Sequence, residues 1–233
     1  MGNLLKFLYP PKCPVCRDVL EDDGTYIHPK CRGKFVKFTE PRCFKCGRTL
    51  LEAEDDICSE CRSKKHSYEY GFCVFEYNDT ARLAMVDYKV NGVRKNGDFF
   101  AAEAAAELAR YIKRIDPEVL VPVPITEKKQ GLRGFNQSEY IARQLSEAWD
   151  IPMDADILYR TGKEIEQKKL SGREREKITA DVFEAVDDMP YRRICIVDDI
   201  YTTGSTMEGC TLALRAKGAR EVGFVVIFSG GMF

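Results

Sequence analysis

The sequence predicts an α/β protein, in which a parallel sheet flanked by helices follows a small cysteine-rich region. Two observations lead to this fold class. Cysteines recur at a fixed spacing near the N-terminus, and short apolar runs alternate with amphipathic stretches in the remainder of the chain. With 233 residues, of which 44% are hydrophobic, the chain can bury the core of one medium domain with a small appendage.

Charge and hydropathy limit the class of protein further. The formal net charge is −1, so a nucleic-acid-binding surface would have to be a local basic patch. The apolar stretch at the start is interrupted by Lys6 and Pro10, and no apolar run approaches the roughly 18 residues that span a bilayer. We therefore expect a cytoplasmic protein without membrane insertion, whose ten cysteines are thiols or metal ligands rather than disulfides.

Eight potential metal ligands form two sets with the same internal spacing. In each set, two residues separated by two positions are followed, after eleven residues, by a second such pair. Every ligand of the first set lies 30 positions before its counterpart in the second, which indicates an internal duplication. The two sets are Cys13, Cys16, His28 and Cys31, and then Cys43, Cys46, Cys58 and Cys61.

This ligand pattern is typical of structural zinc. Two closely spaced pairs complete a closed tetrahedral shell, and free cysteines or disulfides would not explain the repeated spacing. We therefore expect two zinc ions in a zinc-ribbon-like region over residues 1–66, which depends on the metal for its folding. Sequential pairing within each set is preferred, and cross-braced pairing between the sets stays open. Cys73, Cys195 and Cys210 fall outside the pattern and are expected to be buried.

The remaining residues, 67–233, are expected to form the sheet domain. Its first element is an alternating, aromatic strand over 72–79 that ends in an Asn-Asp turn. An amphipathic helix follows over 97–115, with Asp98 in position to cap it. The apolar run at 119–124 indicates a short buried strand that leads into prolines.

The C-terminal half continues the alternation. We expect a helix capped by Asn136, a buried strand over 194–197, a helix over 205–217 with Gly218 as its C-cap, and a last strand over 222–228. Because continuous apolar strands are separated by helices, the sheet should be parallel and covered on both faces. Ligands of such sheets bind at the carboxyl ends of the strands.

The string ICIVDDIYTTGST, residues 194–206, places two carboxylates at such a strand end. Asp198 and Asp199 are followed by a hydroxyl-rich turn that opens a helix, a nest of N–H groups that suits a phosphate dianion. The carboxylates can accept hydrogen bonds from vicinal hydroxyls, directly or through hydrated Mg²⁺. These features describe a ribose 5-phosphate site, and no GxxxxGK[ST] motif supports a P-loop instead. The predicted phosphate contacts are Thr202, Thr203, Gly204, Ser205 and Thr206.

This string resembles the phosphoribosyl pyrophosphate (PRPP) signature of type I phosphoribosyltransferases. The wider chain resembles the ComF family, whose members join a cysteine-rich zinc region to such a domain and are associated with competence for DNA uptake. Two departures from the family pattern are Ile178, where the family usually has asparagine, and His28, which replaces a frequent cysteine. The resemblance rests on the cysteine pairs, the Asp-Asp loop, VDYKVNG (86–92), VPVP (121–124), RGFNQSEYIA (133–142) and QKKLSGRER (167–175).

The resemblance implies that the bond between C1 of ribose and pyrophosphate breaks through an oxocarbenium-like state. Asp198 and Asp199 would then be the catalytic pair that holds the ribose hydroxyls, and Mg²⁺ would offset the charge of pyrophosphate. Lys89 and Arg133 are candidate pyrophosphate contacts, although each can equally be a solvated loop charge. The main-chain turn after Val121 is expected to contact pyrophosphate in preference to either single cation.

The acceptor is not readable from the sequence. Hypoxanthine-guanine transferases resemble this loop but carry an aspartate where this chain has Thr202, so no acceptor-side base is evident. Asn136 and Gln137 could contact an acceptor or cap the next helix. The basic segment 160–177 could be a flap over the site, a phosphate-binding patch or a solvated loop.

Two function classes therefore remain. In the first, the protein is a Mg²⁺-dependent phosphoribosyltransferase that acts on an unidentified nucleobase, nucleotide or amine. In the second, it is a non-catalytic adapter that binds PRPP or ribose 5-phosphate while its zinc region contacts single-stranded DNA or a competence helicase. Release of pyrophosphate with a candidate acceptor would distinguish them.

Overall fold

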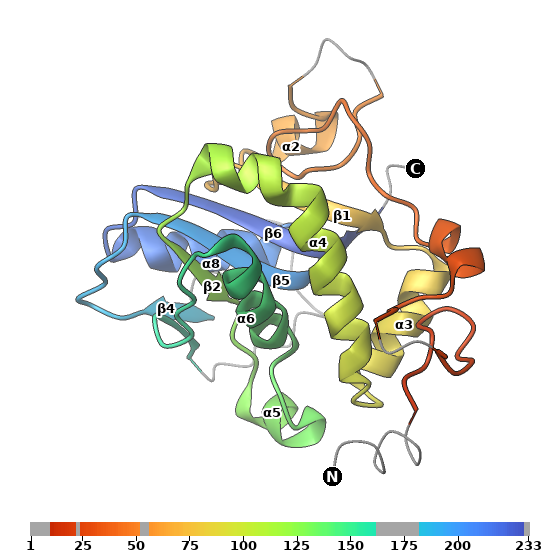
Figure 1. Ribbon diagram of the computed structural model, residues 1–233. Coiled ribbons are helices and arrows are strands. Elements are labelled where there is room, and N and C mark those ends of the chain that lie inside the picture. The colour runs from red at the N-terminus through yellow and green to blue at the C-terminus, as the bar shows by residue number, and fades with distance from the viewer. Residues whose placement is uncertain (1–9, 22–23, 52–55, 162–181, 231–233) are drawn as a thin grey trace, which may run out of the picture.

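A four-stranded parallel sheet forms the centre of the protein. The computed structural model describes residues 10–21, 24–51, 56–161 and 182–230. The sheet has the order β1-β6-β5-β2, and all three neighbouring pairs are parallel, as predicted (Figure 1). Its strands are β1 (Gly71–Glu76), β2 (Val119–Pro122), β5 (Arg193–Tyr201) and β6 (Glu221–Ser229).

The two central strands are longer than their neighbour β2. β5 pairs with β6 from Arg193 to Tyr201, whereas its pairing with β2 ends where Val197 faces Pro122. The last four residues of β5 therefore extend past the end of β2, at the carboxyl edge of the sheet. This edge is where parallel sheets bind their ligands.

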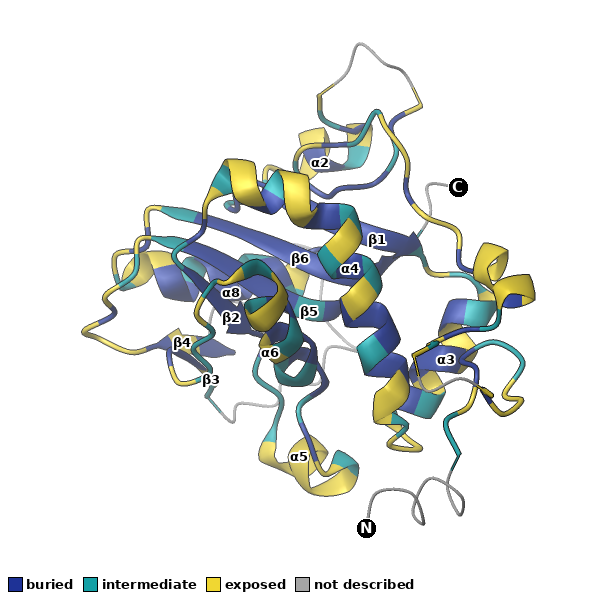
Figure 2. Ribbon diagram, viewed as in Figure 1, coloured by how far each residue is buried: buried dark blue, intermediate teal, exposed yellow. Residues whose placement is uncertain are grey.

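Helices α3 (Asp79–Lys89), α4 (Arg94–Ile115) and α6 (Gln137–Trp149) cover one face of the sheet (Figure 1). Figure 2 shows the buried strands beneath the exposed outer surfaces of α4 and α6. The structure corrects the predicted role of Asp98, which lies inside α4 and accepts a hydrogen bond from the Tyr140 hydroxyl at 2.7 Å. The helix begins earlier than predicted because residues 94–96 continue its turns.

The opposite face is covered by α8 (Ser205–Ala216) and by a short antiparallel pair, β3 (Leu158–Arg160) with β4 (Phe183–Ala185). The predicted helix over 205–217 is therefore present, and Gly218 has the positive φ of 98° expected after its end. A further short helix, α5 (Glu127–Arg133), connects β2 to α6. Most of the basic segment 160–177 lies outside the described residues.

The two halves of the cysteine-rich region have the same local fold. We call residues 11–35 the first ribbon and residues 41–65 the second ribbon. Each begins with a knuckle closed by one antiparallel bridge, Lys12 with Val19 and Arg42 with Thr49. A short helix follows in each, η1 (Pro29–Lys34) in the first and α2 (Ser59–Lys64) in the second. The duplication in sequence is thus a duplication in structure.

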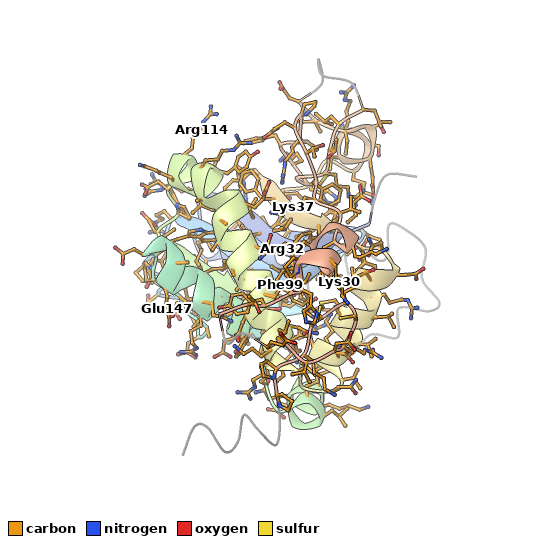
Figure 3. The ribbon with its side chains drawn as sticks, turned by 45° about the vertical axis from the view of Figure 1, so that its right-hand side comes forward. Lys30, Arg32, Lys37, Phe99, Arg114 and Glu147 are labelled. Carbon is orange, nitrogen blue, oxygen red and sulfur yellow. The ribbon has the colours of Figure 1, made fainter. Side chains whose placement is uncertain are left out.

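The ribbons pack into different parts of the core. The first joins the apolar cluster beneath α3 and α4, where the rings of Phe35 and Phe99 lie 5.2 Å apart. Lys37, just after the first ribbon, reaches Glu103 of α4 at 2.9 Å, and Figure 3 labels Lys37 and Phe99 at this junction. The second ribbon joins the cluster beneath α8. None of the helices in the described part of the chain is both long and apolar enough to cross a bilayer.

Candidate functional site

The two carboxylates of the predicted site lie where β5 passes the end of β2. Asp198 Oδ1 accepts a hydrogen bond from the Ser138 hydroxyl at 2.7 Å and from the Asp199 N–H at 2.9 Å. Asp199 Oδ1 accepts from Lys89 Nζ at 2.7 Å, and only 8% of the Asp199 side chain is exposed. Helices α3 and α6 thus each supply one side chain that holds the pair.

The carboxylate pair carries more negative charge than its surroundings compensate. Burial raises the pKa of Asp198 to about 7, and the charge of Asp199 adds to the rise, while the Ser138 hydroxyl and Lys89 oppose it. Asp198 therefore holds a proton to near neutral pH in the free protein. Once this proton is released, the carboxylate oxygens suit ribose hydroxyls or a cation, and Mg²⁺ usually takes one or two protein carboxylates together with phosphate oxygens.

The loop of residues 202–206 follows directly and ends at the N-terminus of α8. Gly204 is the N-cap residue, with a φ of +86°. The first turn of any helix leaves its N–H groups without intrahelical acceptors, and these groups attract anions. The hydroxyls of Thr203 and Ser205 lie 2.9 Å apart beside this turn, and both residues are exposed. The loop therefore presents N–H and hydroxyl donors next to the two carboxylates.

Glycine is required at position 204 for two reasons. The positive φ disfavours residues with a side chain. In addition, a Cβ atom there would lie 2.7 Å from the Tyr201 hydroxyl and 2.8 Å from His66 Nε2. The excluded space is thus on the side of the loop that faces Tyr201 and His66.

The other three predicted phosphate contacts differ in their surroundings. Lys89 lies at the site but is paired with Asp199, and the Arg133 guanidinium donates to Gln137 Oε1 at 2.7 Å. Val121 is fully buried. In the turn after Val121, the Val123 N–H already donates to the Val197 carbonyl at 2.9 Å and the flanking prolines have no N–H. The contact of this turn with pyrophosphate stays a prediction.

Asn136 and Gln137 have structural roles. Asn136 Oδ1 accepts from the Ser138 N–H at 3.1 Å as the cap of α6, and its Nδ2 donates to the Val123 carbonyl. Gln137 is 1% exposed. The residue that sequence reasoning missed is Ser138, whose contact with Asp198 spans 60 positions. A cavity of about 310 Å³ lies beside this helix end, lined by Pro124, Ile125, Glu127, Gln130, Asn136 and Glu139.

The metal-ligand residues form two separate clusters. The ligand atoms of Cys13, Cys16, His28 and Cys31 lie within 4.8 Å of one another, and so do those of Cys43, Cys46, Cys58 and Cys61. This arrangement is the preferred sequential pairing and not the cross-braced one. His28 Nδ1 lies 3.3 Å from the Cys16 sulfur, while its Nε2 faces the Val19 carbonyl at 3.2 Å, as in ligating histidines whose second nitrogen is held by the backbone.

Four thiols this close need a cation to ionise together. In the second cluster, hydrogen bonds with the neighbouring thiols lower the pKa of Cys43, and the contact with Cys43 raises that of Cys46. All ten cysteines are free, and Cys73, Cys195 and Cys210 are buried as expected. The clusters therefore fit structural zinc, which binds deprotonated sulfur.

Comparison with known proteins gives two family models in succession. The double zinc ribbon domain matches residues 4–62, and the phosphoribosyl transferase domain matches residues 89–232. The two matches together cover most of the chain and agree with the two parts described above.

Three curated relatives are similar over most of their length. Competence protein F of Haemophilus influenzae is 28% identical over 95% of this chain and 96% of its own. Competence protein ComFC of Bacillus subtilis is 25% identical over 81% of this chain and 77% of its own. DNA utilization protein YhgH of Escherichia coli O157:H7 is 32% identical over 91% of this chain and 94% of its own.

Proposed function

The chain belongs to the ComF family of double zinc ribbon and phosphoribosyl transferase proteins, and on this premise we propose that it binds PRPP and transfers the phosphoribosyl group to an acceptor. The observation that carries the proposal is the position of Asp198 and Asp199, directly before a helix N-terminus that presents N–H and hydroxyl donors. This combination complements a sugar phosphate, with acceptors for hydroxyls on one side and donors for phosphate on the other.

In the proposed complex, the 5-phosphate occupies the 202–206 loop. The ribose hydroxyls donate to Asp198 and Asp199, and once Asp198 has released its proton to solvent, the two carboxylates stabilise the positive charge that develops near C1. The C1–O bond to pyrophosphate breaks, the acceptor lone pair forms a new bond to C1, and pyrophosphate leaves. Bound Mg²⁺ would supply charge neutralisation at the pyrophosphate oxygens. Lys89 is near enough to the pair to move from Asp199 to a phosphate oxygen.

Calorimetry with PRPP and Mg²⁺ tests the binding step. We expect the parent to bind and the variant that combines Asp198→Asn with Asp199→Asn to lose binding, because an amide is a weaker acceptor for sugar hydroxyls and does not stabilise a cation. The zinc content and circular dichroism of the variant should match those of the parent. Equal affinity of the two proteins would rule out the ribose assignment.

The second candidate is a non-catalytic adapter, with PRPP binding but no transfer. Its support is that the relatives are named for competence and DNA utilization, and that Thr202 stands where the similar loop of hypoxanthine-guanine transferases carries an aspartate. In this role the zinc region, predicted to comprise residues 1–66, would contact single-stranded DNA or a helicase. Incubation with PRPP, Mg²⁺ and a panel of bases, nucleotides and amines separates the two, since only a transferase releases pyrophosphate in an acceptor-dependent manner.

A further inference from the structure

The second ribbon contacts the 202–206 loop through a buried arginine. Arg48 follows Gly47 in the knuckle of the ribbon, and only 6% of its side chain is exposed. Its guanidinium donates to Glu60 of α2 at 2.6 Å, to the Ser229 hydroxyl at the end of β6 at 2.9 Å, and to the Thr202 carbonyl at 3.2 Å. Arg48 therefore connects the knuckle and helix α2 of the second ribbon to the sheet and to the loop.

A second cation reaches the next peptide of the loop. Lys64, the last residue of α2, donates to the Thr203 carbonyl at 3.2 Å and to Glu60 at 2.5 Å. Glu60 lies between the ligands Cys58 and Cys61, so it positions Lys64 and Arg48 from within the metal-binding segment. Two consecutive carbonyls of the loop are thus held by one ribbon.

The direction of these carbonyls determines the direction of the N–H groups. In a trans peptide, the carbonyl of one residue and the N–H of the next point in opposite directions. Because the Thr202 and Thr203 carbonyls point at the second ribbon, the N–H groups of Thr203 and Gly204 point away from it. The ribbon holds the back of the loop and leaves its donor face open to a ligand.

The start of α8 is held from the same side. The N–H and hydroxyl of Ser67 donate to Glu208 at 2.7 and 2.6 Å, and the His66 ring fills the space behind Gly204. The first ribbon has a different set of partners. Its Arg17 pairs with Asp87 of α3 at 3.0 Å, and the residue at the position equivalent to Arg48 is Asp18.

We infer that Arg48 and Lys64 are positioning residues for the 202–206 loop, and that occupation of the second metal site strengthens phosphate binding there. The inference rests on the proposed function for its ligand, PRPP. Coupling between two sites is reciprocal, so a phosphorylated ligand on the loop also strengthens retention of the second metal ion. Among the described residues, the first metal site has no such contact to the loop, and it is expected to be uncoupled.

The test compares variants of the full-length, zinc-loaded protein. Arg48→Gln and Lys64→Gln remove the donors to the loop one at a time and together. Arg42→Gln is the matched control, since Arg42 has a similarly buried side chain and pairs with Glu107 at 2.7 Å, and within the described part of the chain it makes no hydrogen bond or ion pair with the loop. We measure zinc content, thermal midpoint, PRPP affinity by calorimetry with Mg²⁺, and hydrogen exchange of the loop amides.

We expect Arg48→Gln to weaken PRPP binding by about tenfold, and the double variant to weaken it further, since each loses a hydrogen bond from a charged donor. The loop amides should exchange faster in both, and Arg42→Gln should match the parent in affinity and in loop exchange. Lys64→Gln replaces a partly exposed side chain, so it tests the inference even where Arg48→Gln does not fold.

Unchanged affinity and loop exchange in the double variant, with two zinc ions bound, would overturn the inference and leave the proposed function intact. If the parent itself does not bind PRPP, the proposed function fails. Loop exchange then decides the inference alone: faster exchange in the double variant than in Arg42→Gln supports it, and equal exchange overturns it.

A chelator supplies an independent readout of the coupling. With PRPP and Mg²⁺ present, one of the two zinc ions of the parent should be released more slowly than it is without PRPP. This protection should be lost in the double variant. Equal protection of both ions, or protection that persists in the double variant, contradicts the coupling.

Discussion

The proton on Asp198 links the carboxylate pair to the stability of the fold. Because burial raises its pKa from 3.8 to about 7, the native state retains a proton that the unfolded chain releases above about pH 4. The contribution of the neutral Asp198 side chain to the stability of the native state is therefore fully present below pH 4 and is lost as pH rises through 7. A shift of this size corresponds to a few kcal/mol, at about 1.4 kcal/mol per pKa unit.

Asp198→Asn should remove this dependence, because an amide stays neutral and can still accept from Ser138. The free energy of unfolding of the variant minus that of the parent is expected to be larger at pH 8 than at pH 6, by roughly 1 kcal/mol or more. Urea unfolding at both pH values, with zinc content checked at each, measures the difference. If the stabilities of the parent and the variant depend on pH in the same way, Asp198 does not ionise between pH 6 and pH 8 in the native state.

Single residues differ in how far their roles could be predicted. The metal ligands and the Asp-Asp pair could be identified because their chemistry is encoded within a few neighbouring positions. The contact of Ser138 with Asp198 and that of Lys89 with Asp199 span 60 and 110 positions, so they depend on how α6 and α3 dock on the sheet. The turn after Val121 stays a predicted pyrophosphate contact, although its Val123 N–H is already used by β5.

Among the elements, the two ribbons show how one local fold acquires two environments. Arg17 and Gly47 occupy equivalent positions in the knuckles, and both have a positive φ. Gly47 has in addition no room for a side chain, since a Cβ would lie 2.5 Å from the Cys73 nitrogen of β1. The spacing of the ligands predicts the knuckle, whereas the surface against which each knuckle packs is decided by the sheet domain.

The parent should contain about two zinc ions per chain, one for each closed ligand set. Cys43→Ser with Cys46→Ser, and separately Cys13→Ser with Cys16→Ser, should each leave one. We expect both variants to unfold at lower temperature, because each ribbon contributes buried residues to a core cluster of the sheet domain. Elemental analysis and calorimetry measure both quantities; fewer than one zinc in the parent, with thiols oxidised in pairs, would contradict the assignment.

Helices and strands with a clear hydrophobic periodicity were predicted from the sequence, and those that depend on tertiary contacts were not. The apolar strands and the stripe of α4 have strong patterns. Helix α3 was missed because Asn78 and Asp79 were interpreted as a turn, whereas Asn78 caps α3 by accepting from the Ala81 N–H at 2.9 Å. The pair β3 with β4 has strands of only three residues, too short for a periodic signal.

At the scale of the whole molecule, the metal-binding region packs against the sheet domain through buried side chains. Arg48 Nε donates to the Ser229 hydroxyl across 181 positions, and the same side chain reaches the loop at the end of β5. Such contacts join the part of the chain that the double zinc ribbon model matches to the part that the phosphoribosyl transferase model matches. They also imply that a change at the 202–206 loop and a change at the second ribbon should have related consequences in the cell.

A transformation assay in a competent strain with a single copy of the gene tests this relation. Gly204→Val should abolish PRPP binding, because its Cβ would collide with the Tyr201 hydroxyl and His66 Nε2 and because a β-branched residue is strained at a φ of +86°. Gly33→Val is the control, since no atom lies within 4 Å of its Cβ position.

We expect transformation to fall sharply in Gly204→Val and in Cys43→Ser with Cys46→Ser, at unchanged protein levels, and to stay near the parental value in Gly33→Val. Loss in both test variants is expected if DNA uptake needs the phosphate loop and the second ribbon as one unit. Full transformation by Gly204→Val, once its loss of PRPP binding is established, would show that uptake depends on the zinc region without the phosphate site.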